Sequence, residues 1–120
     1  MKLLADILIG IVAAIHVYIV VLEMLLWQKP LGRKVFRTTP EQAAQTATLA
    51  ANQGLYNGFL AAGLLWALLG SAALHRPVAT FFLLCVAVAG AFGAVTVSTR
   101  ILLVQTAPAL AALVCLWLGS

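Results

Sequence analysis

The chain has 120 residues, of which 64% are hydrophobic and 8% are charged, and its formal net charge is +4. Soluble globular domains carry about a quarter charged residues, so this composition indicates a protein in contact with membrane lipid, with room for one domain over residues 1–120. The basic residues stand beside the ends of apolar stretches, a distribution that argues against nucleic acid as a partner. Cys85 and Cys115 lie in separate apolar stretches and form no disulfide framework.

Four apolar stretches follow one another along the chain, at residues 3–28, 54–74, 78–97 and 101–118. Each approaches the roughly 20 residues that a helix needs to cross a hydrocarbon core of about 30 Å. A helix satisfies its own backbone hydrogen bonds, as lipid requires. The first stretch is too long for a signal peptide and contains Asp6, His16 and Glu23. The sequence therefore predicts an all-α fold, an integral membrane four-helix bundle.

The connection after the first stretch contains residue patterns typical of a turn and of a helix start. In "KPLGRKVFR", Pro30 and Gly32 predict a turn. In "TTPEQ", Thr39 suits the N-cap, Pro40 the first helical position and Gln42 the capping-box position three residues after the cap. Helix two is therefore expected to begin near Pro40 and to extend from the cytoplasm into the membrane.

Small residues recur along helix two at spacings of three or four, namely Ala43, Ala47, Ala51, Gly54, Gly58 and Ala62. Small side chains let helices approach closely in lipid. This face is expected to pack against a neighbouring helix or, in a homo-oligomer, against a second copy. In the fourth stretch, Pro108 removes a backbone N–H and predicts a kink.

The polar residues of the apolar stretches gather in one layer. Counted inward from the cytoplasmic boundary at 1.5 Å per residue, Glu23, Asn57 and Gln105 lie about 5–7 Å deep, and His16 reaches the midplane. The other members of the layer are Trp27, Asn52, Gln53, Tyr56, Thr96 and Arg100. Together the ten residues predict a ligand pocket that opens toward the cytoplasm and is floored by His16.

Glu23 requires compensation, because an ionised acid inside a transmembrane helix costs roughly 2.5–3.5 kcal/mol on insertion scales. A partner, water or a bound proton would supply it, and Arg100 is the cation expected to reach it from another helix. Simpler roles remain open. The amides can bond across helices, Thr96 can bond its own backbone, and Tyr56 can anchor the boundary. Glu23 with Arg100 can be a structural pair, and His16 can be a neutral imidazole bonded to a neighbouring hydroxyl.

The motifs "HVYIVVLEMLLW", "NQGLYNGFLAAGL", "GAFGAVT" and "QTAPAL" together resemble a family of small bacterial four-span membrane proteins, catalogued as domain of unknown function thirteen hundred and four. The resemblance covers essentially the whole chain. It implies the four-helix membrane fold, a bacterial cytoplasmic membrane, and a polar motif at His16, Glu23, Asn52, Gln53, Asn57, Thr96 and Gln105. It implies no activity. The plan is also similar, at fold level alone, to DoxX-like bundles.

Three functions compete. The first is a carrier that binds a small molecule and exchanges it for a proton on Glu23. The second is an intramembrane enzyme of the isomerase type, in which His16 and Glu23 would move a proton within a lipid-soluble substrate. The third is a structural or assembly subunit. The sequence holds no nucleophile motif, phosphate loop or multi-histidine set, so it predicts neither a metal site nor a cofactor.

The charge distribution predicts the orientation. Lys29, Arg33, Lys34, Arg37 and Arg100 flank one side of the predicted membrane, and Lys2 and Arg76 flank the other. Cytoplasmic loops carry the excess of Lys and Arg, so both termini are expected outside.

A cysteine introduced by Ser120→Cys is therefore expected to react with a membrane-impermeant thiol reagent added to the outside of intact cells. The unsubstituted chain, with its two native cysteines, is the control. Labelling only after the membrane is opened would place the C-terminus in the cytoplasm and contradict the orientation.

Overall fold

The computed structural model describes residues 1–119, and they fold almost wholly into helices. The elements are α1 (Lys2–Met24), α2 (Pro30–Phe36), α3 (Pro40–Leu69), α4 (Ala72–Thr96), a π-helical turn η1 (Leu102–Thr106) and α5 (Ala107–Leu118). The described part of the chain contains no strand. The predicted all-α class is confirmed.

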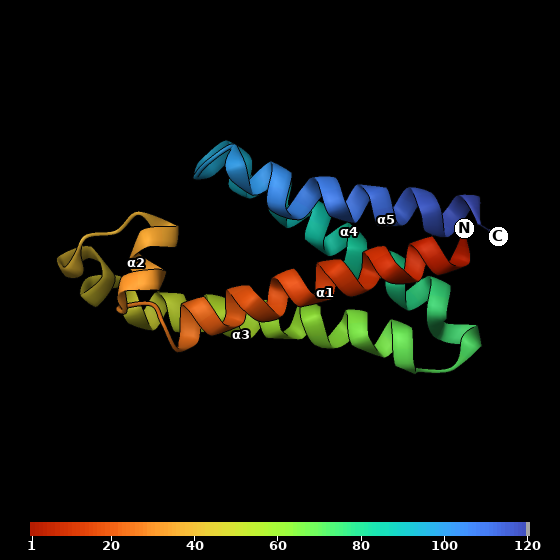
Figure 1. The fold of residues 1–120 in the computed structure, drawn as a ribbon, viewed down its shortest axis with the longest axis horizontal. Helices are drawn as coiled ribbons and strands as arrows, with labels where there is room; N and C mark the ends of the chain where they lie inside the picture. Colours follow the sequence, from red (N-terminus) through yellow and green to blue (C-terminus); the bar gives the residue numbers. More distant parts are fainter. Residues whose placement is uncertain (120) are drawn as a thin grey trace. The chain divides into compact units, whose positions relative to one another are not determined.

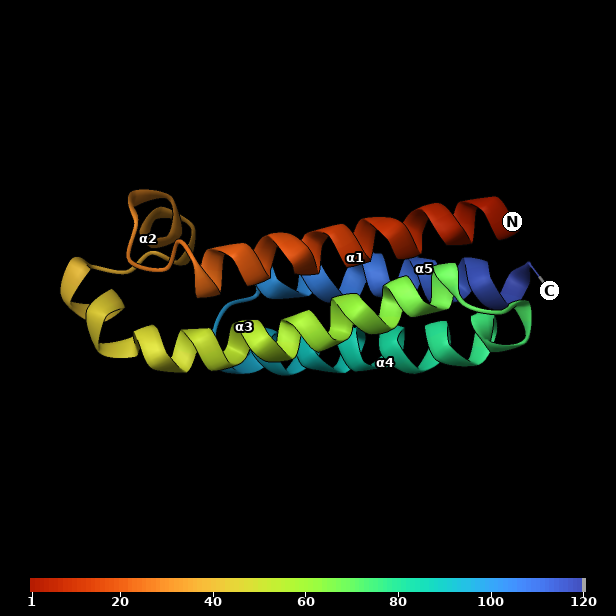
Figure 2. The ribbon, with the colours of Figure 1, turned by 90° about the horizontal axis from the view of Figure 1, so that it is seen from below.

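The first of two compact units comprises Met1–Ile15 and the described part of Leu60–Ser120. In it the first half of α1, the end of α3, α4 and α5 run side by side (Figures 1 and 2). Its core contains mostly aliphatic and small side chains: Ala5, Ile9, Val12, Ala13, Leu64, Ala67, Val78, Ala79, Leu83, Val86, Ala87, Ala109, Ala112 and Leu116. The small side chains of the buried alanines let these helices lie close together.

The second unit comprises His16–Phe59, which holds the end of α1, the short helix α2 and the first part of α3. Small residues of α3 face α1 here. A Cβ on Gly54 would collide with the side chain of Met24, and one on Gly58 would lie 3.9 Å from Val20. Of the two occupants predicted for the small-residue face, a neighbouring helix is the one seen at these two positions.

Helix α3 begins where the sequence predicts. Gln42 N–H donates to Thr39 Oγ1 at 3.1 Å, and Thr39 N–H donates to Gln42 Oε1 at 2.9 Å. These two bonds form the reciprocal capping box, with Pro40 at the first helical position. The predicted start of helix two at Pro40 is confirmed.

The turn predicted at Pro30 and Gly32 is wrong, because these residues belong to α2. Proline at the first helical position has a backbone already suited to a helix. Gly32 is buried, and a Cβ there would collide with the Leu26 carbonyl. The helix ends at Phe36, and Arg37 at its C-cap has a left-handed backbone (φ 57°, ψ 48°).

The connection between α3 and α4 lies earlier than the apolar stretches indicate. Helix α3 ends at Leu69 and α4 begins at Ala72, so the break falls at Gly70 and Ser71 rather than between residues 74 and 78. Ser71 occupies the N-cap position of α4. Pro77 then lies in the second turn of the helix, where its missing N–H leaves one backbone bond unmade.

The irregularity expected at Pro108 takes the form of the π-helical turn η1, directly before Ala107. In a π-helix each N–H bonds the carbonyl five residues back, as Ala107 N–H does to Leu102 O. The turn is packed against α4, where Thr106 Oγ1 donates to the Ala87 carbonyl at 2.9 Å. Gly90 permits this approach, because a Cβ there would collide with Thr106.

Two described helices, α1 and α4, are long and apolar enough to cross a membrane by length and composition. Residues Leu102–Leu118 form a shorter apolar helix. Helix α3 does not reach the same apolarity, because Asn52, Gln53 and Asn57 interrupt it.

A matched pair of glycine substitutions tests the packing of η1. Gly90→Ala is expected to destabilise the protein by about 1–3 kcal/mol, because the new methyl group displaces Thr106. Gly10→Ala is the control. Nothing lies within 4 Å of its Cβ position, so the better helix propensity of alanine should stabilise the protein by up to about 1 kcal/mol. Equal stabilisation by both, measured by reversible unfolding in detergent, would contradict the contact.

Candidate functional site

The centre of the site in the second unit is a hydrogen bond between α1 and α3. Asn57 Nδ2 donates to Glu23 Oε1 at 2.7 Å, and both side chains are partly buried. The same Asn57 nitrogen also donates to the Gln53 carbonyl one turn earlier, at 3.1 Å. The two bonds orient the amide, so that its donor is directed at the carboxylate. The close approach of the helices at Gly54 brings the two side chains within reach.

Glu23 lines a cleft of about 400 Å³ at the end of α1. The other lining residues are Met24, Leu25, Trp27, Gln28, Lys29 and Ala47. The walls thus combine one carboxylate, one ammonium group and an indole with aliphatic surface. Polar groups make up more of this lining than apolar surface does, because Glu23, Gln28 and Lys29 all face the cleft.

Trp27 is held in place from two sides. Its Nε1–H donates to Thr46 Oγ1 at 3.1 Å, and Thr46 Oγ1 in turn donates to the Gln42 carbonyl at 2.7 Å. The ring packs against Phe36 of α2, with centroids 4.8 Å apart and planes tilted by 48°. The indole wall of the cleft is therefore rigidly oriented by α2 and α3.

The other predicted residues of this unit lie at different depths. His16 is fully buried, and it is not among the residues that line the Glu23 cleft. Asn52 and Gln53 are exposed. Tyr56 is 61% exposed and meets Phe59 edge to face at 6.0 Å, in keeping with the boundary role considered for it.

Thr96, Arg100 and Gln105 belong to the first unit. Thr96 Oγ1 donates to the Phe92 carbonyl at 2.8 Å, which is the bond to its own helix that the sequence left open. Arg100 is exposed, and its backbone N–H donates to Ser98 Oγ at 3.3 Å. Gln105 is half-buried in η1. The proposed pairing of Arg100 with Glu23 stays a prediction.

Sequence reasoning missed several participants. Thr46 and Phe36 orient Trp27, yet a threonine and a phenylalanine in a connection carry no chemical signal. In the first unit, His75 Nε2 lies 2.7 Å from Asp6 Oδ1, and Lys2 Nζ lies 3.0 Å from Asp6 Oδ2. An acid and a histidine near the same ends of adjacent helices were the signal for this second cluster. Within residues 1–119, no group of three or more His, Cys, Asp or Glu could hold a metal ion.

A double-mutant cycle tests the bond at the centre of the site. Glu23→Ala and Asn57→Ala are expected to show a coupling energy of about 0.5–3 kcal/mol in unfolding free energy, because each removes the other's partner. The control cycle pairs Glu23→Ala with Gln53→Ala, whose side chain is exposed one turn away. Equal coupling in both cycles would show that the Glu23–Asn57 bond contributes nothing specific.

Comparison with known proteins agrees with the resemblance in the sequence. Residues 10–117 match the family described as "Protein of unknown function (DUF1304)". The chain is also 30% identical over 116 residues to "Uncharacterized protein YpaA" of Lactococcus lactis subsp. lactis (strain IL1403), an alignment that covers 95% of this chain and 97% of that protein. No solved structure matches the chain. The chain therefore belongs to the DUF1304 family.

Proposed function

We propose that the protein is a multi-pass integral membrane protein that binds a small molecule in the Glu23 cleft and exchanges it for a proton on Glu23. The observation that carries this proposal is the placement of a partly buried carboxylate in the wall of a cleft. Asn57 engages Oε1 of that carboxylate. Among the described residues no bond to Oε2 is seen, so this oxygen is available to a ligand or a proton.

The surface of the first unit supports the membrane part of the proposal. Large apolar side chains point outward, among them Leu3 (73% exposed), Phe92 (70%) and Val95 (87%). Soluble monomers rarely leave extended apolar patches in water. Lipid would cover them, with α1 and α4 spanning as single helices and α3 and η1–α5 as the two further spans.

The cationic residues around α2 support the proposed orientation. Lys29, Arg33, Lys34 and Arg37 all lie on α2 or beside its ends. In this arrangement α2 and the Glu23 cleft would face the cytoplasm, with both termini outside.

The chemistry of the walls indicates the kind of ligand. Glu23 offers an acceptor oxygen, and Trp27 with Met24 and Leu25 offers apolar surface. A molecule with a neutral hydrogen-bond donor attached to an apolar body would use both, whereas a cationic group would be repelled by Lys29 in the same wall. The carrier is favoured over an enzyme, because the imidazole proposed to act with Glu23 is fully buried and does not line the cleft.

A homo-oligomer remains part of the proposal, through the small-residue face of α3. Gly54 already packs against α1, and Ala43 is fully buried. Ala51 is half-exposed and is the member of the face that a second copy would contact, whereas Ala47 lines the Glu23 cleft.

Binding at the cleft is tested by native mass spectrometry of the protein released from mild detergent. The wild type is expected to carry a small molecule that Glu23→Gln loses, because the amide is a weaker acceptor than the carboxylate and cannot be ionised. Glu41→Gln is the matched control, since Glu41 is an exposed acid of the same unit. Retention of the molecule by Glu23→Gln, or its loss from Glu41→Gln as well, would contradict binding at the Glu23 cleft.

Proton exchange is tested separately, with the identified molecule in proteoliposomes under an imposed pH gradient. Uptake is expected in the wild type and in Glu41→Gln, and at least a tenfold lower rate is expected in Glu23→Gln. Normal gradient-driven uptake by Glu23→Gln would contradict the coupling. If the substitution changes only the oligomeric state, the structural alternative takes the place of the carrier.

A further inference from the structure

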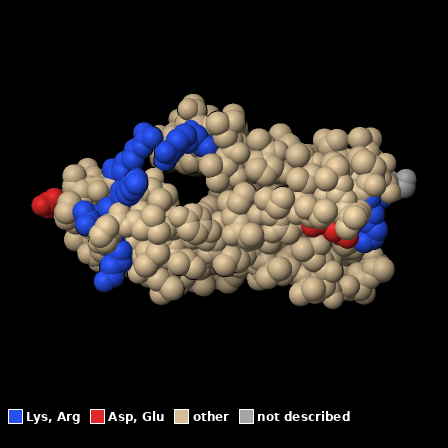
Figure 3. Space-filling model, in the orientation of Figure 1, with Lys and Arg blue, Asp and Glu red and all other residues tan. Residues whose placement is uncertain are grey.

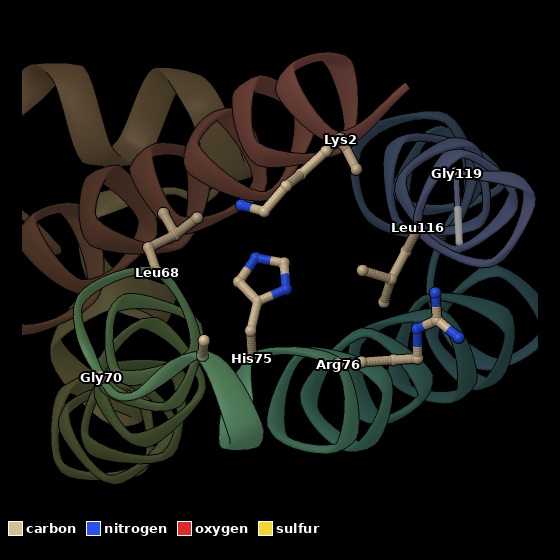
Figure 4. A pocket seen from close by; sticks show the side chains of 9 residues that line it. Lys2, Leu68, Gly70, His75, Arg76, Leu116 and Gly119 are labelled. Atoms are coloured by element: carbon tan, nitrogen blue, oxygen red, sulfur yellow. The ribbon is translucent and has the colours of Figure 1, made fainter.

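A second cleft, of about 400 Å³, lies in the first unit beside the ends of α1, α3, α4 and α5. Figure 4 shows Lys2 and His75 directed into it from α1 and α4, with Leu68 and Leu116 on either side. Arg76 also lines it. The floor and walls are otherwise formed by small residues, Ala5, Gly70, Ala72 and Gly119. None of these residues belongs to the Glu23 site.

One carboxylate holds the basic groups in place. Asp6 Oδ2 accepts from Lys2 Nζ at 3.0 Å, and Asp6 Oδ1 lies 2.7 Å from His75 Nε2. An ammonium group has three N–H donors, so Lys2 keeps two after bonding Asp6. Lys2 and Arg76 carry two positive charges against the single negative charge of Asp6, and His75 adds a third when protonated. The lining is therefore cationic. Figure 3 shows blue and red atoms next to each other at the end of the molecule where Figure 1 marks the N-terminus.

Arg76 is oriented by an aromatic ring rather than by an acid. Its guanidinium carbon lies 4.6 Å from the centroid of the Trp117 ring, and Trp117 Nε1–H donates to Thr80 Oγ1 at 3.1 Å. The acid of this unit, Asp6, is bonded to Lys2 and His75. Within the described chain no salt bridge to Arg76 is seen, so its N–H donors remain available to an anion. A stacked guanidinium also loses little side-chain freedom when it binds.

We propose that this cleft binds a phosphate ester, and that its source is the headgroup of an anionic phospholipid. A phosphate group presents several oxygens, which can accept from donors on separate helices such as Lys2 and Arg76. Basic pockets between helices are a known means of holding lipid headgroups.

The flanks of the cleft favour a lipid over a soluble ester. Leu69 and Leu118, next to the lining residues, are 82% and 69% exposed, and Trp117 is 52% exposed. Aliphatic side chains in these positions can contact acyl chains while the phosphate stays at the cationic groups. Tryptophan beside a basic residue is also typical of the level at which headgroups lie.

The experiment measures binding of dihexanoyl phosphatidylglycerol to the full chain in a neutral detergent, by native mass spectrometry. Dihexanoyl phosphatidylcholine and glycerol 1-phosphate are the comparison ligands. Saturable binding of phosphatidylglycerol is expected, with weaker binding of the choline lipid, whose cationic headgroup faces Lys2 and Arg76. Binding of glycerol phosphate alone would overturn the lipid as the source, and equal binding of both lipids would overturn recognition of the anionic headgroup.

Substitutions locate the binding in this cleft. Arg76→Gln and Lys2→Gln are each expected to weaken phosphatidylglycerol binding about tenfold or more, because each removes a charge-assisted bond. Arg76→Lys keeps the charge and should retain part of the affinity, which distinguishes loss of binding from loss of fold. Arg100→Gln removes an exposed cation of the same unit outside the cleft and should have no effect. Unchanged binding in Arg76→Gln, or an equal loss in Arg100→Gln, would overturn the proposal.

Discussion

The close approach of α1 and α3 at Gly54 is the constraint around which the second unit is built, and the hydrogen bond from Asn57 to Glu23 joins the two helices there. The bond forms because Gly54 has no side chain to keep the helices apart. Once these helices are adjacent, α2 packs its Phe36 against Trp27, and Thr46 accepts from the indole. A partner such as Asn57 stabilises a partly buried carboxylate, since an uncompensated polar group in an apolar environment is expensive. Glu23 therefore has Asn57 as its hydrogen-bond partner only where α1 and α3 approach closely.

In the first unit, a different set of groups bonds the carboxylate. Its acid, Asp6, bonds a lysine one turn earlier and a histidine on α4, while the apolar remainder of the helices packs through alanine and leucine. Thr106 satisfies its hydroxyl on a backbone carbonyl rather than on another side chain. The carboxylates of Glu23 and Asp6 thus each have a hydrogen-bond partner on another helix. Many leucine, valine and phenylalanine side chains are exposed on the surface. The exposed apolar side chains agree with the membrane location that we propose.

Features that depend on neighbours in the sequence could be predicted, and those that depend on packing could not. The capping box of Thr39 and Gln42 spans three residues, so its pattern is visible in the sequence alone. Glu23 and Asn57 both stood out as polar residues in apolar stretches, but their pairing depends on the rotation of two helices about their axes. Hydropathy also misplaced the break between α3 and α4. A hydropathy pattern places the break at the polar residues His75 and Arg76, whereas in the structure the helix is interrupted at Gly70 and Ser71.

The π-helical turn η1 has a consequence for the register of the last helix. A π-helical turn holds one residue more than an α-helical turn between the same hydrogen-bonded levels. Three residues of α5 are buried in the core, namely Ala109, Ala112 and Leu116. Their orientation toward the core depends on the additional residue in η1. Loss of one residue within Leu102–Thr106 would convert the turn to ordinary α-helix and leave the buried face of α5 in phase. Loss of one residue further along α5 would rotate all that follows by about 100° and expose it. Chain length is thus adjustable in η1 and constrained along α5.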